Sequence, residues 1–140
     1  MARSFWDQRS FPLPSGEWLF PKVPAHGVVL LAVRAEQPGQ PQYLGSDLHI
    51  SQGMELSAWE PCKDGLVMEL ELPYSCASLC MDEPTPARRR ATGQFDLKLP
   101  RPPRQAALDG RPLPWLSTGD GCYRFRVAFD QTARVEISLA

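Results

Sequence analysis

The chain has 140 residues, enough to bury the core of one domain and too few for two. Its 15 basic and 16 acidic side chains leave no net field to attract phosphate backbones or anionic lipid, which argues against nucleic acid and membranes as partners. Its 15 prolines argue against long helices. We therefore expect a single domain over residues 1–140.

The compartment is predicted from the apolar runs and the cysteines. The longest apolar run, Val28–Val33, is far shorter than the roughly 20 residues of a membrane-spanning helix. Met1–Asp7 lacks the apolar stretch and cleavage site of a signal peptide, so we expect a cytoplasmic protein. Disulfides are one possible state of the cysteines, but free, buried or partly buried thiols fit this compartment better. The cysteines are Cys62, Cys76, Cys80 and Cys122.

The first half of the chain predicts an irregular lead-in followed by short strands. Residues 1–24 are rich in proline and aromatic residues, with one short strand expected at Glu17–Phe20. Gly27–Arg34 is a continuous apolar run, which is typical of a strand covered on both faces. Leu48–Ile50 and Glu55–Glu60 have the composition of further short strands.

Leu66–Leu72 shows the cleanest alternation in the sequence. Apolar side chains share one face of this segment, and Glu69 and Glu71 share the other, as in a half-buried strand. The Asp-Gly pair directly before it predicts a hairpin with the preceding strand. Ser75–Met81 is expected to be the next strand, and Asp82–Arg90 a loop, because its prolines and like charges oppose pairing.

The second half predicts five more short strands, at Gln94–Leu99, Gln105–Leu108, Arg111–Trp115, Gly121–Phe129 and Arg134–Leu139. A second Asp-Gly pair, at 109–110, predicts another hairpin turn. About eight to ten short strands without a helical pattern indicate an all-β fold, a two-sheet antiparallel β-sandwich of the Greek-key type. A partly closed barrel is the alternative.

Histidine-based catalysis finds little support. The chain has only two histidines, His26 and His49. Ser46 and Asp47 lie close to His49 in the sequence, but a catalytic triad is assembled from separate segments, and a strand turns close neighbours to opposite faces. We therefore expect no triad.

The sequence gives equally little support for catalysis by paired carboxylates and for a metal site. Glu69 and Glu71 would lie roughly 6.5 to 7 Å apart on one strand face, within the range of a glycosidase pair, but the pattern supplies no pocket. Cys76 and Cys80 lack the C-x2-C spacing of structural zinc sites. We expect no catalytic residue, no metal site and no cofactor in this chain.

Aromatic side chains are the remaining candidates for binding. Tryptophan and tyrosine rings stack on the apolar faces of pyranoses, and core packing is the competing use. Of the four tryptophans, Trp6 and Trp115 lie in turn-rich, polar company and are expected to be exposed. Together with Tyr43 they are the candidate carbohydrate-binding residues.

Three segments carry a resemblance to a known family. They are VPAHGVVLL at 23–31, YLGSDLHISQG at 43–53 and LDGRPLPW at 108–115. They resemble the C-terminal domains of melibiase-type α-galactosidases and related glycoside hydrolases, in which a catalytic (β/α)8 barrel is followed by an antiparallel β-sandwich. The catalytic aspartates of that family lie in the barrel, which needs about 250 residues. The resemblance therefore implies a sandwich without the catalytic residues, either a piece of a larger glycosidase or a short reading frame that kept only the sandwich.

Three functions follow as hypotheses. The first is a non-catalytic accessory domain that stabilises or orients a glycosidase barrel, in cis or in trans, with the proline-rich segment Phe11–Pro24 as the contact. The second is a stand-alone carbohydrate-binding module with an aromatic platform. The third is a small enzyme built on Asp47 and His49.

Overall fold

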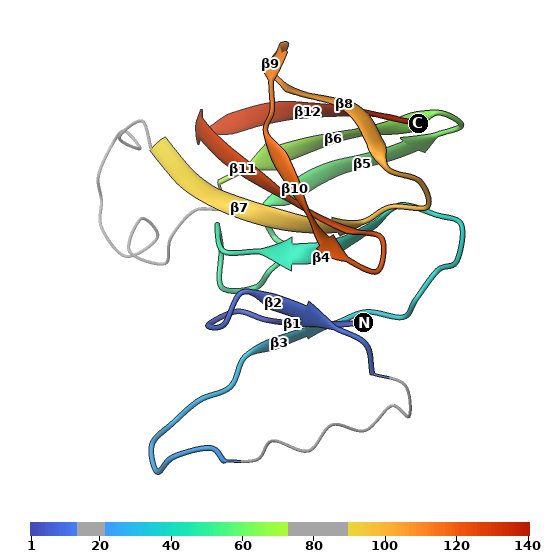
Figure 1. Ribbon diagram of the computed structural model, residues 1–140. Helices are drawn as coiled ribbons and strands as arrows, with labels where there is room; N and C mark the ends of the chain where they lie inside the picture. The colour runs from blue at the N-terminus through green and yellow to red at the C-terminus, as the bar shows by residue number, and fades with distance from the viewer. Residues whose placement is uncertain (14–21, 73–89) are drawn as a thin grey trace.

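The computed structural model describes residues 1–13, 22–72 and 90–140. These residues form twelve strands and no helix, and every strand pair is antiparallel (Figure 1). The predicted strands at Glu17–Phe20 and Ser75–Met81 and most of the predicted contact segment Phe11–Pro24 lie outside the described residues. The predicted loop Asp82–Arg90 also lies outside them except for Arg90, which is a strand residue. The predicted all-β sandwich is confirmed.

Two large sheets make up the sandwich (Figure 1). The four-stranded sheet has the order β10-β11-β7-β4, with bounds Trp115–Gly119, Cys122–Asp130, Arg90–Lys98 and Gln42–Ser46. The five-stranded sheet has the order β5-β6-β12-β8-β9, with bounds Leu56–Cys62, Gly65–Glu71, Thr132–Leu139, Pro103–Leu108 and Arg111–Pro112. Among the described residues no strand joins the two sheets by hydrogen bonds, so the fold is a sandwich and not the partly closed barrel.

A third, smaller sheet is formed near the N-terminus, and we call it the N-terminal sheet. Its order is β2-β1-β3, with bounds Arg9–Phe11, Ala2–Ser4 and Leu31–Val33. It lies beside β4, at the bottom of the sandwich in Figure 1. The lead-in, expected to be irregular, therefore contributes two strands.

The core lies between the two large sheets and follows the period-two pattern of the sequence. Phe95 of β7 and Phe125 of β11 stack with ring centroids 5.0 Å apart. Alternate residues of β6 and β12 face these rings and are buried, whereas Glu69 and Glu71 are exposed, as their alternation predicts. Alternation alone thus identifies the buried face of β6.

Both predicted Asp-Gly hairpins form, each in its own way. Asp109 and Gly110, between β8 and β9, have φ of 49° and 76°, as a two-residue turn matching strand twist requires. In the other hairpin Cys62 pairs with Gly65, so the turn residues are Lys63 and Asp64, and Gly65 begins β6. A Cβ at Gly65 would lie 2.1 Å from the carbonyl oxygen of Ile137 in β12, so no larger residue fits there without a shift of the backbone.

Three predicted strands differ from the structure. Arg111–Trp115 is divided, with Arg111–Pro112 in β9 and Trp115 at the start of β10 in the other large sheet. Only Leu31–Val33 of the run Gly27–Arg34 is a strand, and it belongs to the small N-terminal sheet. Val28 lies before this strand and is 67% exposed. Leu48–Ile50 forms bends and turns. There the Ser46 hydroxyl accepts a hydrogen bond from the Leu48 amide, and such local side-chain bonds compete with a sheet ladder.

Candidate functional site

A buried ionic cluster joins the N-terminal sheet to the four-stranded sheet. Arg3 of β1 donates from Nε to Asp96 Oδ2 of β7 at 3.0 Å. Arg124 of β11 donates to the same carboxylate, from Nε to Oδ1 at 2.7 Å and from Nη2 to Oδ2 at 2.9 Å. These hydrogen bonds raise the pKa of Arg124. One carboxylate therefore holds two guanidinium groups from different strands.

Arg3 fits into this position because the residue packed against it, Gly45, has no side chain. Its Nη1 donates to the Ser46 carbonyl at 2.8 Å and to Gln52 Oε1 at 2.7 Å. A Cβ at Gly45, whose φ is +144°, would lie 3.1 Å from Arg3 Cδ, so glycine makes room for the arginine. Arg3 is 0% exposed.

A second buried cluster surrounds Glu55. Tyr43 donates to Glu55 Oε1 at 2.6 Å, and the Ser46 hydroxyl donates to the same oxygen. Burial, and then the charge of Glu55, raise the pKa of Tyr43 well above its usual range. Because Glu55 is fully buried, this carboxylate is positioned for packing and offers no surface for acid–base chemistry on a substrate.

Ser46, Asp47 and His49, which lie close together in the sequence, do not form a catalytic triad. Ser46 bonds Glu55, Asp47 accepts from Gln8 Nε2 at 3.0 Å, and His49 Nδ1 lies 2.7 Å from the Ser51 hydroxyl. Each side chain is thus engaged with a partner outside the trio. In the described ranges no three His, Cys, Asp or Glu residues are grouped to hold a metal ion.

The cysteines follow the free-thiol prediction in part. Cys62 and Cys122 are both free. Cys122 is buried as expected, and burial raises its pKa, whereas Cys62 is exposed because it ends edge strand β5. Cys76 and Cys80 lie outside the described residues.

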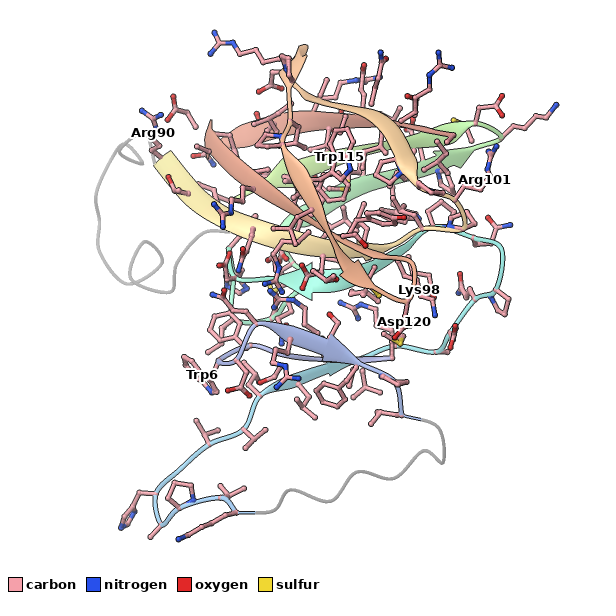
Figure 2. All side chains as sticks on the ribbon, in the orientation of Figure 1. Trp6, Arg90, Lys98, Arg101, Trp115 and Asp120 are labelled. Carbon is pink, nitrogen blue, oxygen red and sulfur yellow. The ribbon has the colours of Figure 1, made fainter. Side chains whose placement is uncertain are left out.

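The three candidate carbohydrate-binding residues, Trp6, Trp115 and Tyr43, lie in different parts of the structure. Trp6 and Trp115 are 54% and 38% exposed, as expected. Tyr43 is 6% exposed, and its ring packs against Trp59 and Phe95 at centroid distances of 6.3 and 6.1 Å. Trp6 lies at the N-terminal sheet and Trp115 in the sandwich above it (Figure 2). The three rings therefore form no shared platform.

The N-terminal sheet and the segment 22–30, which leads into β3, expose several large apolar side chains, which we call the N-terminal apolar surface. Its members are Trp6, Val23, Val28, Val29 and Val33. Trp6 packs edge-on against Phe5 with centroids 4.9 Å apart, which orients the exposed indole. The segment 22–30 extends below β3, away from the sandwich (Figure 1).

A groove of about 940 Å³ lies on the five-stranded sheet, and we call it the Trp115 groove. It is lined by residues of β6, β8 and β12 and by the segment 110–115 that leads into β10. The Trp115 ring lies 6.4 Å from that of Phe125, which ties the groove wall to the core. The groove also includes Arg104 and Gln105, which carry no local sequence signal, because the β8–β12 register places them there.

No protein-family model matches the chain, and no curated protein matches it. The resemblance carried by the three motifs therefore stays a prediction. The described segments contain no helix of the length and hydropathy needed to cross a bilayer.

Proposed function

We propose that the chain is a non-catalytic accessory β-sandwich of an α-galactosidase-like glycoside hydrolase, which stabilises or orients a catalytic barrel in cis or in trans. The observation that carries the proposal is the N-terminal apolar surface on a sheet that is anchored by buried charges. The motifs at 23–31, 43–53 and 108–115 supply the family.

The exposed apolar side chains supply the driving force for docking. Large exposed apolar patches mark interaction sites on proteins, whereas single exposed apolar side chains are common, so the proposal requires these side chains to be covered together. Covering one fully exposed valine or tryptophan stabilises a complex by about 1.5–3 kcal/mol before the costs of association. Trp6 and Val33, at 54% and 60% exposure, would contribute part of that range each.

The ionic cluster makes the docking surface rigid. A buried charge pair is stable only with good geometry, so Arg3, Asp96 and Arg124 define one position of β1 against β7. A partner held on β1 and β3 is then oriented relative to the whole sandwich. This is the behaviour required of a domain that orients a neighbour.

An activity assay tests the non-catalytic half of the proposal. The purified chain is incubated with an aryl α-galactoside, and we expect no hydrolysis above that of buffer. Hydrolysis that disappears when carboxylates of this chain are changed to amides would contradict the proposal.

A binding assay tests the docking half. The chain is mixed with, and also fused to, the separately produced barrel of a melibiase-type α-galactosidase that lacks its own sandwich. We expect a complex in size-exclusion chromatography and a higher melting temperature for the barrel. W6D combined with V33D should abolish both effects. The matched control is L116D, because Leu116 is a similarly exposed apolar residue on β10 of the sandwich. Equal loss in both variants, or no stabilisation by the wild type, contradicts docking through the N-terminal sheet.

A further inference from the structure

Part of the Trp115 groove is lined by the outer face of the five-stranded sheet. Val67, Glu136 and Ala107 are Cα partners across β6, β12 and β8, so their side chains share one face. Their sequence neighbours Leu66 and Ile137 belong to the core, which makes the shared face the outer one. The next row of lining residues is Gly65, Ser138 and Gln105.

The hollow exists because short side chains occupy its middle. Gly65 has no side chain, and the side chains of Ala107 and Ser138 are short. Elsewhere on the same face of β12 and β6 stand Arg134 and Glu69, which are long and charged. The volume of about 940 Å³ lies within the range of small-molecule sites and can hold more than one sugar ring.

Three polar side chains around the groove are free to bind a ligand. Arg104, Gln105 and Ser138 form no side-chain hydrogen bond or ion pair within the described part of the chain. The acidic lining residues Asp64 and Glu136 are paired with Arg101 and Arg134, which lie outside the lining, so the groove has no strong charge of either sign. A neutral ligand that carries both donors and acceptors satisfies these groups, whereas a purely apolar ligand would bury them unpaired at a cost.

Trp115 adds the apolar half of the site. Its indole is 38% exposed and packs against Phe125, so part of the ring remains open to a ligand. Pro112 and Pro114 flank it in the lining. Flat apolar surface beside unpaired donors matches the two-sided chemistry of a pyranose, which has C–H faces and hydroxyl edges.

We propose that the Trp115 groove binds a neutral oligosaccharide. One pyranose stacks on Trp115, and its hydroxyl groups bond with Arg104 and Gln105. This site is distinct from the N-terminal apolar surface, so sugar binding and barrel docking stand or fall separately.

The test is isothermal titration calorimetry of the whole chain with a panel of neutral di- and trisaccharides that contain galactose, glucose or mannose. We expect at least one sugar to bind saturably with a Kd of about 0.1–5 mM, the affinity of a shallow site. W115A should weaken that sugar at least about tenfold, the loss of one aromatic stack. W6A, which removes the other exposed tryptophan, should leave the Kd within about twofold.

Because Trp115 packs on Phe125, W115A is paired with variants that cannot disturb the core. R104A and Q105A change exposed side chains, and each should weaken the same sugar about threefold to tenfold with an unchanged melting temperature. No saturable sugar, or sugar binding indifferent to W115A and R104A, would overturn the proposal. The proposal would also be overturned if no sugar bound but an apolar peptide did, and if W115A abolished the binding of that peptide.

Discussion

The carboxylate of Asp96 holds the N-terminal sheet on the sandwich, so we expect Asp96→Asn to destabilise the protein strongly. Asparagine keeps the shape of the side chain, but it removes the charge and replaces one acceptor oxygen with an NH2 donor that faces a guanidinium group. The side chains of Arg3 and Asp96 are 0% and 2% exposed, so water cannot replace the lost partner. Within the described residues Arg3 has no second ion pair.

The size of the effect follows from the geometry. Two unit charges about 4 Å apart interact by about 4 kcal/mol at an effective dielectric constant of about 20. Removing one partner of a buried pair costs about 3–5 kcal/mol in measured cases, because the remaining charge is left buried. The loss of the Arg124 ion pair adds little to this cost, because the Arg124 side chain is 19% exposed and water can solvate its charge. We expect Asp96→Asn to lower the free energy of unfolding by about 3–5 kcal/mol, out of roughly 5–15 for a typical domain.

Urea denaturation followed by circular dichroism measures this difference, and hydrogen exchange shows where it acts. If the N-terminal sheet opens on its own, the amides of β1 and β3 will exchange faster while the core strands stay protected. The control is Arg124→Gln, which removes the bonds from the less buried guanidinium to Asp96 and to the Gln8 carbonyl and leaves Arg3 paired, at a cost of about 1–2 kcal/mol. If Asp96→Asn costs less than about 1 kcal/mol and exchange is unchanged, the inference of a desolvated anchor is refuted.

Three further predictions concern single groups. Burial, and then Glu55, raise the pKa of Tyr43, so the folded state keeps a proton that the unfolded chain loses. The contribution of Tyr43 to the free energy of unfolding should be complete below about pH 10 and should fall above it by up to about 1.4 kcal/mol per pH unit. Urea denaturation midpoints measured at several pH values should therefore fall less steeply with pH in Tyr43→Phe than in the wild type. Iodoacetamide should alkylate the exposed Cys62 at least about tenfold faster than Cys122, because burial raises the pKa of the Cys122 thiol. Peptide mass spectrometry measures both rates, and equal rates would contradict this prediction. Gly110→Ala should cost about 1 kcal/mol in thermal melts, because φ is +76° and a Cβ there meets no other atom; a negligible cost would show that the turn relaxes.

Local patterns in the sequence are sufficient to predict many of the strands and turns of the sandwich. Alternation in Leu66–Leu72 predicts β6 and its buried face, and Asp-Gly pairs predict two hairpins, because side-chain period and turn geometry are properties of neighbouring residues. The exposure of Trp6 and Trp115 also follows from their polar, turn-rich surroundings.

Where the pattern is not local, the sequence misleads. The apolar run Gly27–Arg34 has the composition of a buried strand, but burial requires a sheet on each side, and the chain places only Leu31–Val33 at the edge of a small one. Tyr43 has the composition of a binding residue, yet its neighbours in space make it a core residue bonded to Glu55.

The sequence by itself therefore determines the class of fold, the core-facing residues of the regular strands and the absence of a recognisable catalytic motif. Only the tertiary structure decides that Arg3 and Asp96, 93 residues apart, form a buried pair. It also decides that Arg104 and Trp115 line one groove. The physical reason is that both groupings depend on how strands distant in sequence are paired and stacked, and no period within a single strand encodes that choice.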